Sequence, residues 1–111
     1  MTERRQAMDI ALALPGTYED TPFHDPNWVV ARRMGSGKIF VCTFERQGRI
    51  WLNLKVRAGW AEVLCASYES VVPAYHMNKR HWVSVILDGT VPDSEIERLI
   101  MESYDLTGKN K

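Results

Sequence analysis

KIFVCTFER (residues 38–46) and RIWLNLKV (residues 49–56) flank Gln47-Gly48, and together the three pieces predict a β-hairpin. A two-residue turn fixes the register of the strands. The expected pairs are Arg46–Arg49, Phe44–Trp51, Cys42–Asn53 and Phe40–Lys55, alternating with Glu45–Ile50, Thr43–Leu52, Val41–Leu54 and Ile39–Val56. Because side chains alternate across a sheet, the two sets define its two faces. The second face is almost wholly aliphatic and is expected to pack against a helix.

The first face mixes aromatic rings with cations and an amide: Phe40, Phe44, Trp51, Lys38, Arg46, Arg49, Lys55 and Asn53. Aromatic platforms flanked by cations are what single-stranded nucleic acid binding needs, since bases stack on rings while cations follow the phosphates. A duplex would use the same cations on its backbone. Three structural alternatives stay open. A helix or a second protomer covers the rings, the cations snorkel at the rim, or the register differs.

The net charge of the chain is zero, but its cations are concentrated in the middle. Residues 28–57 hold seven cations against Glu45 alone, a balance of +6, and each flanking segment has a balance of −3. A local field of this kind can hold a polyanion on one face of a neutral protein. Ion pairs with the acidic segments of the same chain explain the pattern equally well.

The remaining segments predict one α+β domain over residues 1–111. We expect helices over residues 2–14, 58–68 and 92–107, further strands over residues 28–34, 71–77 and 80–87, a loop over residues 18–26, and a tail over residues 109–111. Asp93 is placed to cap the last helix. The second helix is expected to share one face among Trp60, Val63, Leu64 and Ser67, and the last helix to bury Ile96, Leu99, Ile100, Ser103 and Tyr104. The order helix, three strands, helix, two strands, helix gives a two-layer sandwich with a mainly antiparallel sheet.

Residues 73–82, PAYHMNKRHW, hold the densest chemistry in the chain. One hypothesis is that a hairpin presents this stretch to a ligand through Tyr75, Asn78, Lys79, Arg80 and Trp82. The simpler interpretation is a polar turn between two strands, with Trp82 buried. A small-ligand or catalytic pocket is a further hypothesis, and it would involve Tyr75, His76, His81 and Trp82.

No pattern of residues indicates an enzyme, a cofactor or a metal site. The Gly35-Ser36-Gly37-Lys38 segment joins two strands, so it is a turn and not a phosphate-binding loop. Two histidines near one another are too few ligands for zinc. A nucleophile paired with a histidine, from Ser84 or Cys42, is expected by chance in any chain of this composition.

The two cysteines and the hydropathy of the chain predict a cytoplasmic protein. Cys42 and Cys65 lie in apolar runs and are expected to be free thiols in a reducing compartment. No apolar run is long enough for a signal peptide or a membrane span, so no membrane partner is expected.

Several separated motifs together resemble the MmcQ/YjbR family of small bacterial proteins. They occur in the family's order: Leu14-Pro15-Gly16, Trp28, Gly37-Lys38-Ile39-Phe40, Leu54-Lys55, residues 73–89 and Ser103-Tyr104-Asp105-Leu106. The resemblance implies a CyaY-like fold, related to that of secretion chaperones. It also implies a DNA-binding function, and it carries no assigned reaction.

The leading hypothesis is therefore a DNA-binding module, for duplex or single strand, that is a monomer or a homodimer. Phosphates would be held by Lys38, Arg46, Arg49, Lys55, Lys79 and Arg80, with Asn78 in the same turn and with Trp51 and Phe44 stacking or packing. The alternative is a protein-interaction or scaffold domain whose aromatic face forms a homodimer or binds a peptide, without binding nucleic acid.

Overall fold

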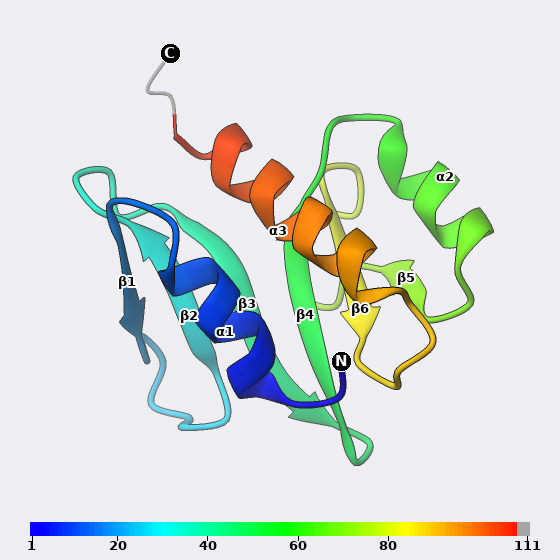
Figure 1. Cartoon of the computed structure of the whole chain (residues 1–111), viewed down its shortest axis with the longest axis horizontal. Coiled ribbons are helices and arrows are strands. Elements are labelled where there is room, and N and C mark those ends of the chain that lie inside the picture. The colour runs from blue at the N-terminus through cyan, green and yellow to red at the C-terminus, as the bar shows by residue number, and fades with distance from the viewer. Residues whose placement is uncertain (109–111) are drawn as a thin grey trace.

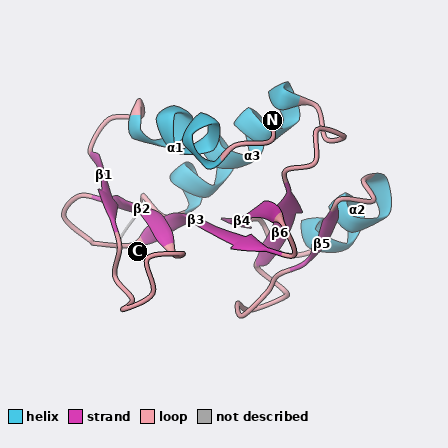
Figure 2. Ribbon diagram, turned by 90° about the horizontal axis from the view of Figure 1, so that it is seen from below, coloured by secondary structure: helices cyan, strands magenta, loops and turns pink. Residues whose placement is uncertain are grey.

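The computed structural model describes residues 1–108, and the predicted tail at residues 109–111 lies outside them. Its elements are α1 (Arg4–Leu12), β1 (Thr17–Asp20), β2 (Val29–Arg33), β3 (Ile39–Arg46), β4 (Arg49–Lys55), α2 (Trp60–Ser67), β5 (Val71–Pro73), β6 (Trp82–Ile86) and α3 (Asp93–Leu106). The strands form one antiparallel sheet in the order β1-β2-β3-β4-β6-β5 (Figure 1). Figure 2 shows α1 and α3 on one side of this sheet, α2 beside its β5 edge and loops on the opposite side. The predicted α+β two-layer sandwich is confirmed.

The β3–β4 hairpin forms in the predicted register. Six pairs run from Arg46–Arg49 at the turn to Val41–Leu54. Gln47 and Gly48 both have positive φ angles, 55° and 75°, as the turn that matches the right-handed twist of the strands requires. The local turn chemistry therefore decides which residues share a face.

Beyond Val41 the predicted pairs of Phe40 with Lys55 and of Ile39 with Val56 are wrong. Ser103 of α3 stands between the strands, because its hydroxyl accepts the Lys55 N–H (2.9 Å) and donates to the carbonyl oxygen of Phe40 (2.5 Å). Phe40 is fully buried and packs edge-to-face on Tyr104, with ring centroids 5.5 Å apart. Phe40 thus belongs to the helix-covered side of the sheet and not to the mixed face.

The aliphatic face packs against α1 and α3, as expected. Val41, Leu52 and Leu54 are completely buried there. Their partners come from both helices and from β6: Met8, Ala11, Ile96, Leu99, Ile100, Val83 and Val85. None of the helices within residues 1–108 has the length and apolar character needed to cross a membrane.

The second and third helices differ from expectation in detail. Trp60 and Val63 were expected to share one face of α2 with Leu64 and Ser67, but Trp60 and Val63 are each 48% exposed, whereas Leu64 and Ala61 are buried. The helix lies at the edge of the sheet, so only a narrow stripe of it is covered. Asp93 makes no side-chain capping bond, and Pro92 occupies the N-cap of α3.

The edge strands also differ from the predicted ones. The expected loop at residues 18–26 begins with β1, an edge strand whose central residues Tyr18 and Glu19 are exposed. Its sequence therefore shows no alternation of apolar and polar residues. At the other edge β5 ends at Pro73, so that residues 74–81 form a longer loop than the predicted two-residue connection.

Asp88, which follows β6, is expected to make the stability of the fold sensitive to acid. Burial favours its neutral form, but hydrogen bonds from the hydroxyls of Ser70 and Thr90 and from the Thr90 N–H outweigh this effect and lower its pKa from 3.8 to about 2. A lowered folded-state pKa stabilises the fold above about pH 4, and this contribution is lost as pH falls toward 2. We expect Asp88→Asn to flatten the pH dependence of the unfolding free energy between about pH 4 and 2, as measured by urea denaturation. An unchanged slope would contradict this role.

Candidate binding site on the helix-free face

The face of the sheet opposite α1 and α3, here called the helix-free face, carries a layer of packed aromatic rings. Phe44 and Trp51 project from β3 and β4 and are only 1% and 6% exposed. Trp28 stacks on Phe44 with ring centroids 4.2 Å apart, and Tyr75 lies 5.6 Å from Phe44 and 6.2 Å from Trp51. Trp28 and Tyr75 belong to the 21–28 loop and the 74–81 loop. The mixed aromatic and cationic face predicted from the sequence is thus covered by two loops of the same domain. The predicted alternatives for this cover were a helix or a second protomer.

Two buried polar side chains hold the 74–81 loop on this face. Asn53 donates its side-chain amide to the carbonyl oxygen of Tyr75 (2.8 Å), and Ser84 accepts the Tyr75 N–H (2.9 Å). The Ser84 hydroxyl in turn donates to Asn53 Oδ1. Both side chains are fully buried. The Ser84 hydroxyl is therefore engaged in positioning the loop and is not paired with a histidine as a nucleophile would be.

Arg46 closes the end of the aromatic layer that lies nearest the β3–β4 turn. Its guanidinium carbon lies 4.8 Å from the ring centroid of Trp51 and 4.5 Å from that of Tyr75. The Trp51 indole N–H donates to the carbonyl oxygen of Arg46 (3.1 Å). Arg46 is thus fixed by cation–π contacts within the domain.

Beside the aromatic layer lies a pocket of about 340 Å³ between the two loops. The 21–28 loop, β3 and the 74–81 loop each contribute to its lining: Phe23, Asp25, Trp28, Ile39, Cys42, His76 and Met77. A smaller hollow of about 260 Å³ adjoins it and shares Asp25, Trp28 and His76. The pocket has the size and the mainly apolar lining of a small-molecule site.

His76 has a left-handed backbone conformation, with φ of 61°. Such a conformation is uncommon for residues other than glycine and is often found at functional positions. The His76 ring lies 4.0 Å from that of Tyr75 and 6.4 Å from that of Trp28. The strained turn thereby directs His76 to the wall that the two hollows share.

Cys42 lies at the floor of the pocket as a neutral thiol. Burial raises its pKa to about 12, although the charge of Arg32 acts in the opposite direction. A neutral thiol is a poor nucleophile. We expect a thiol reagent at pH 8 to modify half-buried Cys65 first and to reach Cys42 at least tenfold more slowly, which mass spectrometry of the labelled peptides measures. Equal labelling rates would show that the floor of the pocket opens readily.

The structure distributes the predicted nucleic-acid residues over several places. Lys38 and Lys55 lie at one end of the β3–β4 hairpin, whereas Arg46 and Arg49 lie at the other. The two ends are about 23 Å apart, because about seven strand residues separate them. The 74–81 loop carries the other three, all exposed: Asn78, Lys79 and Arg80. Trp51 is buried, so its ring packs and is not available to stack on a base.

Of the predicted pocket residues, the structure brings only Tyr75 and His76 to the hollows. His81 lies at the start of β6, where its carbonyl oxygen accepts the Val56 N–H (2.8 Å), and Trp82 pairs with Lys55. Neither residue lines the two hollows. The sequence did not single out five residues that line the larger of these two hollows: Phe23, Asp25, Trp28, Ile39 and Met77. The available signal was the pair of aromatic residues, Phe23 and Trp28, in the otherwise polar 21–28 loop.

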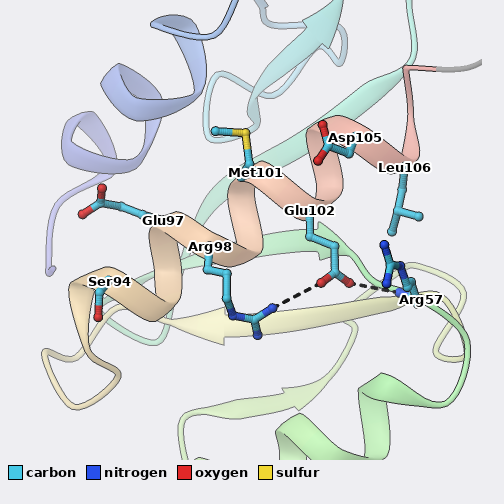
Figure 3. A pocket seen from close by; sticks show the side chains of 8 residues that line it. All are labelled: Arg57, Ser94, Glu97, Arg98, Met101, Glu102, Asp105 and Leu106. Carbon is cyan, nitrogen blue, oxygen red and sulfur yellow. Dashed lines mark hydrogen bonds and ion pairs between the residues drawn. The ribbon is translucent and has the colours of Figure 1, made fainter.

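A second, larger hollow of about 470 Å³ lies along the outer side of α3 (Figure 3). Its central charged groups, Arg98 and Glu102, are already engaged within the domain. Arg98 pairs with Glu95 (2.6 Å) and Glu102 (3.3 Å), and the other Glu102 oxygen accepts the Arg57 N–H (3.2 Å). In the part of the chain that the structure describes, no group of three or more His, Cys, Asp or Glu side chains is placed to hold a metal ion. The pocket on the helix-free face is therefore the stronger candidate site.

The fold and this pocket define a small α+β domain with an aromatic-walled hollow on one face of its sheet. The YjbR family model matches residues 12–106, and the chain belongs to the YjbR family. The resemblance seen in the sequence is confirmed, while the CyaY-like comparison stays a prediction.

Relatives and solved structures agree with this assignment. The chain is 32% identical over 99 residues to the uncharacterized protein YjbR of Escherichia coli K12, covering 89% of this chain and 81% of that protein. It is 34% identical over 100 residues to the uncharacterized protein YbdF of Escherichia coli O157:H7, with 90% and 80% covered. The crystal structure of Deinococcus radiodurans protein DR2400 superposes with a TM-score of 0.88 at 33% identity, covering 99% of this chain and 81% of that one. A crystal structure from Pseudomonas syringae gives 0.78 at 30% identity, with 95% and 98% covered.

Proposed function

We propose that this domain binds a small organic molecule in the pocket between the 21–28 loop and the 74–81 loop. The single observation that carries the proposal is the pocket of about 340 Å³, with apolar walls and few polar groups. The loops that form it are held in place, because Trp28 stacks on buried Phe44 and the backbone of Tyr75 is bound by Asn53 and Ser84. The pocket is thus preformed.

The proposal is for binding without catalysis. The two candidate nucleophiles on this face are both unsuited to attack a substrate. Ser84 is fully buried and hydrogen-bonded to Asn53, and the pKa of the Cys42 thiol is raised to about 12. Within the described residues neither the Ser84 hydroxyl nor the Cys42 thiol is hydrogen-bonded to a histidine or an acid that would activate it.

A library of small fragments, titrated into ¹⁵N-labelled protein, tests the proposal. We expect amide shifts to concentrate in the 21–28 loop, in β3 near Ile39 and in residues 75–77. Ile39→Trp should fill the pocket and weaken these fragments at least tenfold. Met34→Trp is the matched control, because Met34 is 60% exposed and lies outside the pocket lining. If fragments bind the Ile39→Trp variant as tightly as they bind the unmodified protein, the proposal is contradicted.

Binding of DNA is the second candidate, and one observation favours it. Among residues 1–108, the cations of the predicted interface make no salt bridge: Lys38, Arg46, Arg49, Lys55, Lys79 and Arg80. Arg46 is held over Trp51 and Tyr75, whereas in the described part of the chain the other five cations have no acidic partner and remain available to phosphates. Against it, Phe44 and Trp51 are buried and the hairpin cations are divided between two ends.

Fluorescence anisotropy of a labelled duplex and a labelled single strand, at two salt concentrations, tests this candidate. Six phosphate contacts on a duplex predict a log–log salt slope of about −5. Lys79→Glu combined with Arg80→Glu should weaken such binding while leaving the fold intact, since both side chains are exposed. No binding at low salt would remove DNA from consideration, and sedimentation would then test the remaining prediction of a homodimer or peptide-binding domain.

A further inference from the structure

We propose that the pocket on the helix-free face selects a small organic cation, such as a quaternary ammonium or a protonated amine with an apolar body. The inference rests on the proposed function, since it names the class of ligand for the same pocket. Three features of the lining carry it: the aromatic rings, the single acidic side chain and the apolar floor.

The aromatic rings form an incomplete cage around the mouth of the pocket. Phe23 stands perpendicular to Trp28, with an interplanar angle of 88° and centroids 5.9 Å apart. The His76 ring is tilted by 43° against that of Trp28. One face of Trp28 is covered by Phe44, so the rings of Phe23 and His76, set at these angles, enclose the space beside Trp28. The face of an aromatic ring is electron-rich and attracts a cation, whereas its edge is electron-poor. Aromatic cages of this kind bind alkylated ammonium groups through cation–π attraction.

Asp25 supplies the only acidic side chain of the lining. Its Oδ1 accepts the Asn27 N–H (2.9 Å), and within the described residues its Oδ2 has no hydrogen-bond donor. Arg32, whose charge acts on Cys42 at the floor, is paired with Asp20 (2.8 Å) and does not line the pocket. The pocket therefore offers an unmatched negative charge beside its rings, and this charge complements a cation.

The floor excludes strongly hydrated groups. Ile39, Cys42 and Met77 present aliphatic carbon and sulfur, and the Cys42 thiol is neutral. A compact, strongly hydrated ammonium ion would lose its water shell on entering, and the floor offers no hydrogen bonds in its place. Alkyl groups on the nitrogen, by contrast, bury favourably against this floor. A ligand with alkylated nitrogen thus fits better than an inorganic cation or an anion.

The test compares choline with 3,3-dimethylbutan-1-ol, which has the same shape but carries carbon in place of the charged nitrogen. Each is titrated into the ¹⁵N-labelled full chain, and the Trp28 indole N–H and the amides of residues 75–77 are followed. We expect choline to bind about tenfold more tightly than the alcohol. Asp25→Asn, which can keep the bond to Asn27, should reduce this ratio to about two. Asp9→Asn, an exposed acid on α1, should leave it unchanged.

The inference would be overturned if the unmodified protein bound choline and the alcohol with nearly equal affinity. It would also be overturned if Asp25→Asn did not change the ratio of the two affinities. If the alcohol binds in the pocket as tightly as choline does, the cation preference fails while the proposed small-molecule function stands. If neither compound shifts the pocket signals but other fragments do, the inference again fails alone. If no fragment shifts them, both proposals fail.

Discussion

Replacing Phe44 by alanine is expected to lower the free energy of unfolding by about 3–5 kcal/mol, the cost of truncating a fully packed phenylalanine. Phe44 is 1% exposed and lies within 6 Å of three other rings, with centroid distances of 4.2, 5.6 and 5.9 Å. Its removal leaves a cavity beside Trp28, one of the residues that line the pocket. Urea denaturation followed by circular dichroism measures the change, and ligand binding should be lost with it.

Phe23→Ala provides the matched control for this prediction. Phe23 is 52% exposed and packs edge-to-face on the same Trp28. We expect a loss of less than about 1 kcal/mol, because substitutions of exposed side chains rarely cost more. A loss below about 1.5 kcal/mol for Phe44→Ala would show that the aromatic layer is not packed as described.

Replacing Asn53 by alanine is expected to cost about 2–4 kcal/mol and to release the 74–81 loop. The substitution leaves the Tyr75 carbonyl oxygen and the Ser84 hydroxyl without their partner, and each such buried group costs about 1–3 kcal/mol. Because Asn53 and Ser84 act on the same loop, the double variant with Ser84→Ala should cost less than the sum of the two single ones. Denaturation of all three variants measures this coupling.

Hydrogen exchange separates the role of these bonds in the loop from a general loss of stability. In Ser84→Ala the Tyr75 amide loses its acceptor, so it should exchange faster than the neighbouring sheet amides. Asn78→Ala, a substitution at an exposed position of the same loop, should leave Tyr75 protected. Additive costs for Asn53 and Ser84, together with unchanged exchange at Tyr75, would contradict the account of the loop.

The features of the fold that depend on near neighbours in the sequence were predictable. Gln47-Gly48 and the alternation on either side of it predict the hairpin register, and the apolar spacing of α3 predicts its buried face. Phe40 was misplaced for a physical reason. Its side is decided by Ser103, which lies 63 residues away and bridges β3 and β4. No local pattern contains that contact.

The candidate site was only partly predictable, because loops without periodicity build most of it. Tyr75 and His76 stood out by composition, and the structure places both at the hollows. Asp25 and Met77 reach the same space only through the paths of the 21–28 and 74–81 loops. The positive φ of His76 is a tertiary property that the sequence does not display.

The cations of the middle segment illustrate how charge counting and structure differ. A balance of +6 over residues 28–57 suggests one basic surface. The structure instead pairs Arg32 with Asp20, places the guanidinium of Arg33 3.6 Å from the ring centroid of Tyr104, and fixes Arg46 over Trp51 and Tyr75. Several of these charges therefore serve packing.

A crystal structure of the protein soaked in a concentrated mixture of small amines and neutral isosteres would test the central claim most directly. The account predicts density in the pocket on the helix-free face, against Trp28 and His76, with a nitrogen near Asp25. Density only in the charged hollow along α3, or a pocket closed by its own loops in every soak, would contradict it.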